Sequence, residues 1–322
     1  MNTTNGSSDN RVVQNYWNTQ FANKVSSRIR FWESDHIVRH INKTICGTPV
    51  NGFSQGLALK VRRLAPEAVP FKRGISIGSG IAAKEITLLT KGLVEHFDLF
   101  ELSDVSMIQA VKNAESAGVA DRISLIKADT FSTVKKPATY DFIHWDNSLH
   151  HMTNTEQAVE WSFKVCKPGG MFFMNEYVGP SRFQWTSNML VVANRIRNIL
   201  PQQYFFNPNN PMGIGLEQAL REMNPRAFYS RTVSVPSIDT MLQLDPSEAA
   251  DSEHILPSVR KFFPDADITI IGGAVYHLAL NDILQNFNES DDAWLLDLFL
   301  LMDDMMIAMG ETHYATALAL KK

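Results

Sequence analysis

A short glycine turn places the strongest limit on how this chain can fold. Gly78-Ser79-Gly80 follows an apolar run at 74–77 and precedes a segment with helical spacing at 82–93. Glycines at such a turn let the backbone bend sharply into a helix and approach a ligand closely. The turn therefore predicts a ligand site at the carboxyl end of a first strand.

Apolar runs and helical segments continue to alternate after this turn. We expect strands at 96–102, 122–127, 140–145 and 171–177, with helices at 106–118 and 155–166. This alternation is typical of a parallel sheet with helices on both faces and right-handed crossovers. Two further strands are expected at 267–271 and 274–280, because Gly272-Gly273 between them is typical of a two-residue hairpin.

The chain divides into four expected parts. Residues 1–70 have a mixed helical pattern and are predicted to form an N-terminal helical lid, and residues 71–180 form the sheet core. Residues 181–265 are irregular and rich in aromatic residues, proline and asparagine, which predicts a cap over the site. Residues 266–322 are expected to supply the last strand pair and a C-terminal helix.

Composition and charge narrow the choice of partners. The 322 residues carry a net charge of −4, whereas proteins that bind phosphate backbones usually have a basic excess, so nucleic acid is not expected. The most apolar stretch, 294–309, is interrupted by aspartates and is too short to span a bilayer. No signal peptide is recognised. We therefore expect a cytoplasmic protein without a membrane partner, in which 294–309 is buried or faces a partner such as a second copy.

Acidic residues stand at the ends of the predicted strands. Glu101 ends the second strand, Asp129 follows the third, and Asp146-Asn147 ends the fourth. Ligands of open α/β sheets bind outside these carboxyl ends. A carboxylate at Glu101 can accept both hydroxyls of a ribose, and Asp129 is placed to meet an adenine amino group.

The same segments resemble the class I S-adenosylmethionine (SAM) methyltransferases. The resemblance covers roughly residues 71–178, and its segments are 76–80, 100–103, 127–129, 140–143, 149–151 and 167–170. It implies a Rossmann-like, seven-stranded, mostly parallel α/β sheet, with the antiparallel seventh strand supplied by the segments beside Gly272-Gly273. It also implies SAM as the cofactor and a small molecule as the substrate.

The resemblance assigns roles at the cofactor site. It implies that Gly78, Ser79 and Gly80 hold the methionine part of SAM, that Glu101 holds the ribose and that Asp129 contacts adenine. Asp146 is expected to border the cofactor.

The chain departs from the family in two places. The common acidic residue of the first strand is Ser76 here, and the usual third glycine is Ala82. NAD is the competing ligand for such a turn, but the further glycine of its fingerprint is replaced by Ala83.

Five residues are candidates for the reaction, namely Asn147, His150, His151, Glu176 and Tyr177. The Asn147 and Glu176 side chains can bind an amine, and the Tyr177 ring can hold a sulfonium by cation–π attraction. His150 and His151 are candidate general bases, or they begin a helix and satisfy backbone groups. No metal site is expected, because adjacent residues do not share a helix face.

Three functions remain open from the sequence. The first is methyl transfer to a small molecule of secondary metabolism. The second is cyclisation of SAM itself to azetidine-2-carboxylate and methylthioadenosine, since the sequence also resembles the azetidine-2-carboxylate synthases of this fold. The third is a non-catalytic module that keeps the fold, which the departures at Ser76 and Ala82 suggest.

Overall fold

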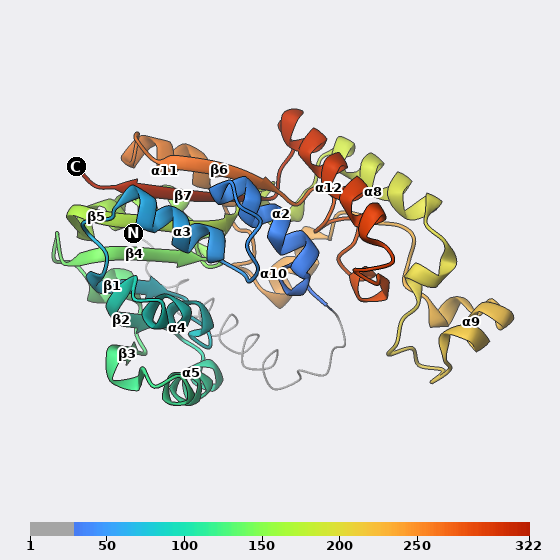
Figure 1. The fold of residues 1–322 in the computed structure, drawn as a ribbon, viewed down its shortest axis with the longest axis horizontal. Coiled ribbons are helices and arrows are strands. Elements are labelled where there is room, and N and C mark those ends of the chain that lie inside the picture. Colours follow the sequence, from blue (N-terminus) through green and yellow to red (C-terminus); the bar gives the residue numbers. More distant parts are fainter. Residues whose placement is uncertain (1–28) are drawn as a thin grey trace.

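The computed structural model describes residues 29–322, so residues 1–28 of the expected lid lie outside the described residues. One seven-stranded sheet organises the chain, with strand order β3-β2-β1-β4-β5-β7-β6 (Figure 1). β1 to β5 pair in parallel, and β7 runs antiparallel to both β5 and β6. The strands are β1 Phe71–Ile77, β2 Val94–Phe100, β3 Ile123–Ile126, β4 Tyr140–Asp146, β5 Cys166–Tyr177, β6 Asp267–Gly272 and β7 Tyr314–Leu320.

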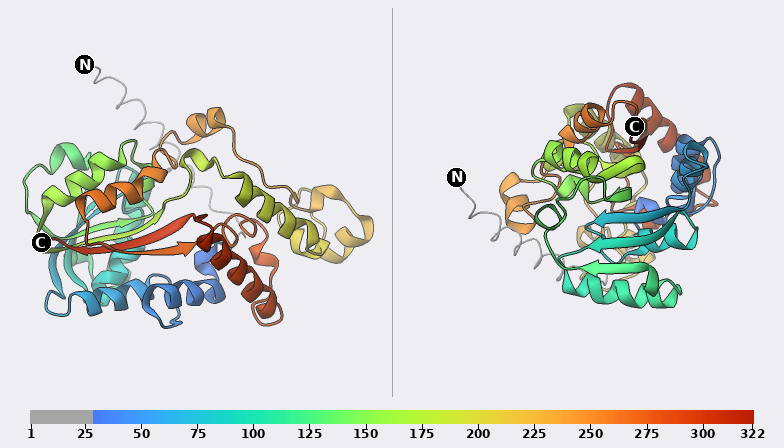
Figure 2. Two further views of the ribbon diagram at one scale, coloured as in Figure 1. Left: turned by 90° about the horizontal axis from the view of Figure 1, so that it is seen from above. Right: turned by 90° about the vertical axis from the view of Figure 1, so that its left-hand side faces the viewer.

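Helices cover both faces of the sheet. The described helices are α2 Asp35–Cys46, α3 Gln55–Leu64, α4 Ala83–Thr90, α5 Asp104–Ser116, α6 Thr130–Thr133, α7 Thr155–Val165, α8 Ser187–Ile199, α9 Leu216–Glu222, α10 Ile238–Leu244, α11 Ile255–Phe262 and α12 Ala293–Ala308. The helices α2 to α5 and α12 share one apolar cluster, whereas α7 and α11 share a second cluster with the opposite strand residues. This division gives a three-layered molecule (Figure 2).

Alternation along the strands separates the two apolar clusters. Phe142 and Phe173 belong to the first cluster, and their neighbours Ile143 and Phe172 belong to the second. Successive side chains point to opposite faces of a sheet, so a strand covered on both faces is apolar throughout. Trp145 packs in the second cluster, fully buried, and its indole N–H donates to Ser162 Oγ of α7 at 2.9 Å.

The strands and helices predicted around the glycine turn are confirmed within a few residues, and so is a helix over most of 294–309. The hairpin prediction is wrong. β6 ends at Gly272, residues 274–280 form buried turns, and β6 pairs instead with the distant β7. Gly272 and Gly273 have φ of 85° and 105°. The carboxylate of Asp303 in α12 accepts hydrogen bonds from Gly273 N at 2.8 Å and from Val275 N at 2.6 Å.

The segment from α8 to α10 extends beyond the carboxyl ends of the parallel strands, together with α12 (Figure 1). We keep the name cap for residues 181–265, and the four-part division of the chain stays a prediction. Within residues 29–322, the longest helix is α12 with 16 residues, and none has the length and apolar character that crossing a membrane requires.

Candidate functional site

The turn after β1 packs directly against the turn after β4. Gly78 and Gly80 have left-handed φ of 66° and 55°, a conformation that glycine adopts without strain. A Cβ on Gly78 would lie 3.1 Å from the Cβ of Ser148. Two of the predicted site segments are therefore in contact at the carboxyl edge of the sheet, where β1 and β4 are neighbours.

Glu101 connects the glycine turn with the end of β2 through hydrogen bonds. Its Oε2 accepts a hydrogen bond from Gly80 N at 2.7 Å, and its Oε1 accepts from Leu102 N and Ser103 N at 2.8 and 2.7 Å. Burial raises the pKa of Glu101, although these N–H groups favour the charged form. A carboxylate has about four lone-pair sites, so capacity remains for a ribose hydroxyl.

Asp146 is buried at the end of β4, and only one of its two carboxylate oxygens has partners within residues 29–322. Its Oδ1 accepts from the side-chain amides of Asn147 and Asn175, each at 3.0 Å, and lies 2.9 Å from Lys84 Nζ. Burial raises the pKa of Asp146, and Lys84 opposes that shift. Its Oδ2 is buried with no hydrogen-bond partner among the described residues.

Two hydroxyls at the same edge share this property, because Ser79 Oγ and Ser148 Oγ are also buried without a partner in the described part of the chain. Unsatisfied buried oxygens are costly, and native proteins usually pair them with a ligand or water. The three oxygens fit the amino and carboxylate groups of an amino acid bound at the glycine turn.

Asp129 lies at the expected strand end, after β3, and is exposed. Its Oδ2 accepts from Ser132 N at 2.8 Å and caps the N-terminus of α6. The side chain therefore has a structural partner, and its expected contact with adenine stays a prediction.

Glu176 is fully buried and is engaged by the chain itself. Its Oε1 accepts from Ser148 N and Leu149 N, each at 2.6 Å, and its Oε2 lies 2.7 Å from His150 Nδ1. Burial raises the pKa of Glu176, but His150 and the two N–H groups lower it by more. The net pKa of Glu176 is therefore below its ordinary value. Glu176 thus positions His150 and the turn after β4.

The rings of His150 and His151 lie side by side. The sequence argument did not anticipate this, because it assumed that adjacent residues point away from each other on an α-helix. Leu149–His151 is a 3-10 turn, η3, and the two ring centroids are 4.3 Å apart. Burial lowers the pKa of His150, but Glu176 and Glu248 raise it above the ordinary value. Burial and the charge of His150 lower the pKa of His151. The two neighbouring imidazoles therefore differ, because the protonated form is favoured at His150 and the neutral form at His151.

The Tyr177 ring is buried within an aromatic group. Its hydroxyl donates to Pro180 O at 3.1 Å, and its ring lies 5.0 Å from Phe183 and 6.3 Å from His150. Only 2% of the residue is exposed, so the ring contributes to the wall behind His150, and its expected contact with a sulfonium stays a prediction.

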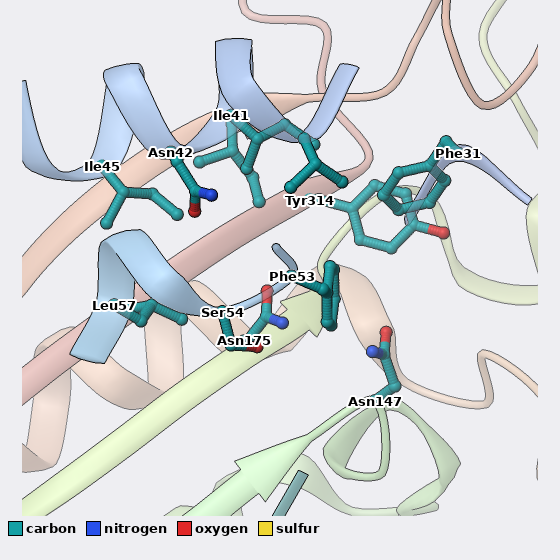
Figure 3. Close-up of a pocket in the computed structure, with 12 residues that line it drawn as sticks. Phe31, Ile41, Asn42, Ile45, Phe53, Ser54, Leu57, Asn147, Asn175 and Tyr314 are labelled. Atoms are coloured by element: carbon teal, nitrogen blue, oxygen red, sulfur yellow. The ribbon is translucent and has the colours of Figure 1, made fainter. Parts of the chain in front are cut away.

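A pocket opens next to Asp146, between the ends of β4 and β5 and the helices α2 and α3 (Figure 3). Asn147 and Asn175 border it, and its other walls are largely apolar, with Phe31, Phe53 and Tyr314 among them. Its cavity volume is about 10 Å³, which is room for about one water molecule. Asn147 has a left-handed φ of 56°, which is strained for a residue with a side chain.

Sequence reasoning missed an acidic residue that compensates for Ser76. Glu85 of α4 is buried, and its Oε1 accepts from Ser76 Oγ at 2.6 Å and lies 3.1 Å from His144 Nδ1. A carboxylate therefore lies beneath the glycine turn even though β1 has none. The signal was available, because Glu85 stands in the first turn of the helix that follows Gly80.

Lys84, Asn175 and Glu248 were also missed as members of the site. Lys84 precedes Glu85 on α4, and Asn175 lies beside Asp146 in the register of β4 and β5. Glu248 comes from the cap, 3.5 Å from His150 Nε2, and no local pattern connects it with β4.

Comparison with known proteins agrees with this geometry. Residues 75–174 match the family model described as a methyltransferase domain. The ubiquinone/menaquinone biosynthesis C-methyltransferase UbiE of Roseobacter denitrificans is 22% identical over 114 residues, which are 35% of this chain and 45% of that protein. The chain therefore matches less than half the length of this curated relative.

One solved structure shares the fold over nearly the whole chain. The [4+2]-cyclase SpnF superposes with a TM-score of 0.50 at 14% identity, covering 97% of this chain and 96% of that one. A phosphoethanolamine N-methyltransferase 2 of Haemonchus contortus, solved with SAM, gives 0.44 at 11% identity, covering 95% and 60%. Over residues 75–174 the chain is thus similar to a methyltransferase domain, and this segment lies within the seven-stranded sheet described above.

Proposed function

We propose that this protein binds SAM at the carboxyl edge of the sheet and transfers its methyl group to a small molecule held under the cap. The observation that carries the proposal is the glycine turn bound to Glu101 through Gly80 N, beside the unpaired Oδ2 of Asp146. A nucleoside linked to an amino acid matches both ends of this arrangement.

The residues of the edge suit the separate parts of SAM. Gly78, Ser79 and Gly80 would hold the methionine part, with Asp146 Oδ2 available to its ammonium group. Glu101 would hold a ribose hydroxyl, and Asp129 would contact the adenine. When bound, SAM supplies an electrophilic methyl group on a sulfonium.

The chain's own residues would position the acceptor and exclude water from it. The neutral His151 suits the role of a general base for a hydroxyl acceptor, because its lowered pKa leaves it free of a proton at neutral pH. His150, held by Glu176 at 2.7 Å, would keep the adjacent ring of His151 in place. The irregular, aromatic-rich cap suits a small-molecule substrate of secondary metabolism.

Cyclisation of SAM is the second candidate, favoured by the two side-chain amides at the border of the small pocket beside Asp146. Its largely apolar walls come from α2 and α3, and its polar border is Asn147 and Asn175. The neutral amino nitrogen of SAM would attack the carbon next to sulfur, forming a C–N bond as the C–S bond breaks. The electron pair goes to sulfur, the ring nitrogen loses a proton, and azetidine-2-carboxylate and methylthioadenosine result.

Calorimetric titration of the protein with SAM tests the shared step of both candidates. We expect saturable binding, weakened by roughly 1–3 kcal/mol in Glu101→Ala, because a hydrogen bond to a ribose hydroxyl is lost together with the carboxylate that holds Gly80 N. Unchanged affinity in that variant would contradict the ribose assignment. Absence of binding to both SAM and its demethylated product would favour the third function, a non-catalytic module.

Mass spectrometry of the protein incubated with SAM and no acceptor separates the two reactions. Methylthioadenosine and azetidine-2-carboxylate in equal amounts, above the spontaneous background, would establish the cyclase. Unchanged SAM would favour methyl transfer, and small hydroxyl-bearing and amine-bearing compounds would then be screened for a mass gain of one methyl group.

A further inference from the structure

A cluster of possible metal ligands lies where the turn after β4 meets the cap. His150 and His151 belong to η3, and Glu248 follows α10. One nitrogen or oxygen atom from each of the three residues lies within 4.8 Å of the other two. We propose that these side chains bind a divalent transition-metal ion of the zinc type, which joins the cap to the core. This inference replaces the roles proposed above for the two histidines, because an imidazole bound to a metal ion acts neither as a general base nor as a cation, and methyl transfer would then depend on positioning and on the exclusion of water.

The spacing of the ligand atoms suits such an ion. His150 Nε2 lies 3.5 Å from Oε1 of Glu248. Two ligands bonded to one tetrahedral zinc at about 2.0–2.1 Å are roughly 3.4 Å apart, so this pair needs almost no movement. Two imidazoles and one carboxylate form a set that zinc prefers, and a fourth position remains for water or an oxygen of the substrate.

Glu176 orients His150 as a metal ligand requires. It lies 2.7 Å from His150 Nδ1, and the N–H groups of Ser148 and Leu149 hold the same carboxylate in place. Histidines that bind metals usually donate their second ring N–H to a carboxylate in this way, which directs the other nitrogen to the ion. Here the other nitrogen, Nε2, faces Glu248.

A second carboxylate supports His151. Asp245 is 3% exposed, and its Oδ2 lies 3.9 Å from His151 Nδ1 with no hydrogen-bond partner in the described part of the chain. Its Oδ1 accepts from Ser247 Oγ at 2.6 Å, and that hydroxyl lies 2.9 Å from the same ring nitrogen.

The cluster is also rich in negative charge. Three carboxylates surround the two imidazoles, namely those of Glu176, Asp245 and Glu248. The cation Arg182 donates to the backbone oxygen of Glu248 at 3.1 Å and interacts electrostatically with the carboxylates of Asp245 and Glu248, so it offsets part of this charge. A divalent cation would balance the excess charge.

The test is calorimetric titration of the tag-free, chelator-treated full chain with zinc chloride, repeated with cobalt chloride and visible absorption. We expect one equivalent to bind and cobalt to show the intense absorption of a tetrahedral site. His151→Gln and Glu248→Gln should each weaken zinc binding at least about tenfold. The His151 and Glu248 side chains are 16% and 24% exposed, and glutamine is polar and of similar size, so these variants are expected to fold, which circular dichroism would check.

His254→Gln is the matched control. His254 lies in the same cap segment and pairs with Asp251 at 2.6 Å, outside the cluster. It should bind zinc as the unaltered chain does. Zinc binding that survives in both cluster variants, or that is lost equally in His254→Gln, would overturn the proposal, as would the absence of any stoichiometric binding.

Discussion

Replacing Gly80 by alanine tests where the cofactor lies. Gly80 precedes α4 with φ of 55°, and a Cβ added there meets no protein atom within 4 Å. Alanine in the left-handed region costs about 1–2 kcal/mol, and no steric clash adds to that cost. The variant should therefore fold, with a melting temperature lower by a few degrees.

Gly92 supplies a matched control at the other end of α4. Its φ is 64°, and its added Cβ also meets nothing within 4 Å, so Gly92→Ala should lose the same 1–2 kcal/mol of unfolding free energy. The two variants differ in what the new methyl group faces. At Gly80 it points into the space that the proposal gives to SAM, whereas Gly92 lies away from the carboxyl edge.

We expect Gly80→Ala to raise the Kd for SAM at least about tenfold, which is 1.4 kcal/mol, and Gly92→Ala to leave it unchanged. Calorimetric titration gives the affinities, and thermal unfolding of the free proteins gives the loss of stability that each alanine causes. Equal affinity in the two variants would refute the placement of SAM at the glycine turn, whether both bind normally or both bind weakly.

Three further predictions concern buried groups. Ser76→Asp should lower the free energy of unfolding by about 2 kcal/mol or more, because it places a second carboxylate beside Glu85. Adding Glu85→Ser to this variant should restore much of the loss, as measured by urea unfolding. Burial raises the pKa of Asp303 to about 7, above its unfolded value, so its contribution to stability is complete at low pH and is lost as pH rises through 7. Urea unfolding from pH 5 to 8 should show this loss relative to Asp303→Asn, and parallel curves would contradict it. Burial raises the pKa of Cys166 to about 12, so the native protein should resist alkylation there at pH 8, as mass spectrometry of peptides would show.

The first five strands could be predicted because their sequence signals are local. Each is an apolar run, covered on both faces and followed by a turn, and the carboxyl ends of parallel strands must meet at one edge. The sequence pattern therefore predicts that Gly78, Glu101 and Asp146 lie close together. The structure adds how they are joined, through Gly80 N and Lys84.

The last strand could not be recognised from local pattern. Residues 314–320 read Tyr-Ala-Thr-Ala-Leu-Ala-Leu, and alanine and leucine favour helix, while burial on both faces removes the alternation of a half-exposed strand. The glycines at 272 and 273 were misread for a related reason. A Cβ on Gly272 would overlap Asp303 Oδ2, so glycine is required by a residue distant in sequence and not by a hairpin.

The cap residues of the site were unpredictable for the same reason. Glu248 and Asp245 reach His150 and His151 only through the path of the cap, and that path depends on packing rather than on periodicity. By contrast, Glu85 follows the glycine turn within one helical turn, so the strand-to-helix pattern could have identified it.

The position of β7 between β5 and β6 also constrains the order in which the sheet can be completed. β6 pairs with no described strand except β7, although β7 is synthesised after the whole of α12. While a ribosome is still making α12, residues 267–272 have no strand to join, and the edge of β5 is open to other chains. Nascent chains released before residue 314 should therefore recruit chaperones more strongly than chains only slightly longer.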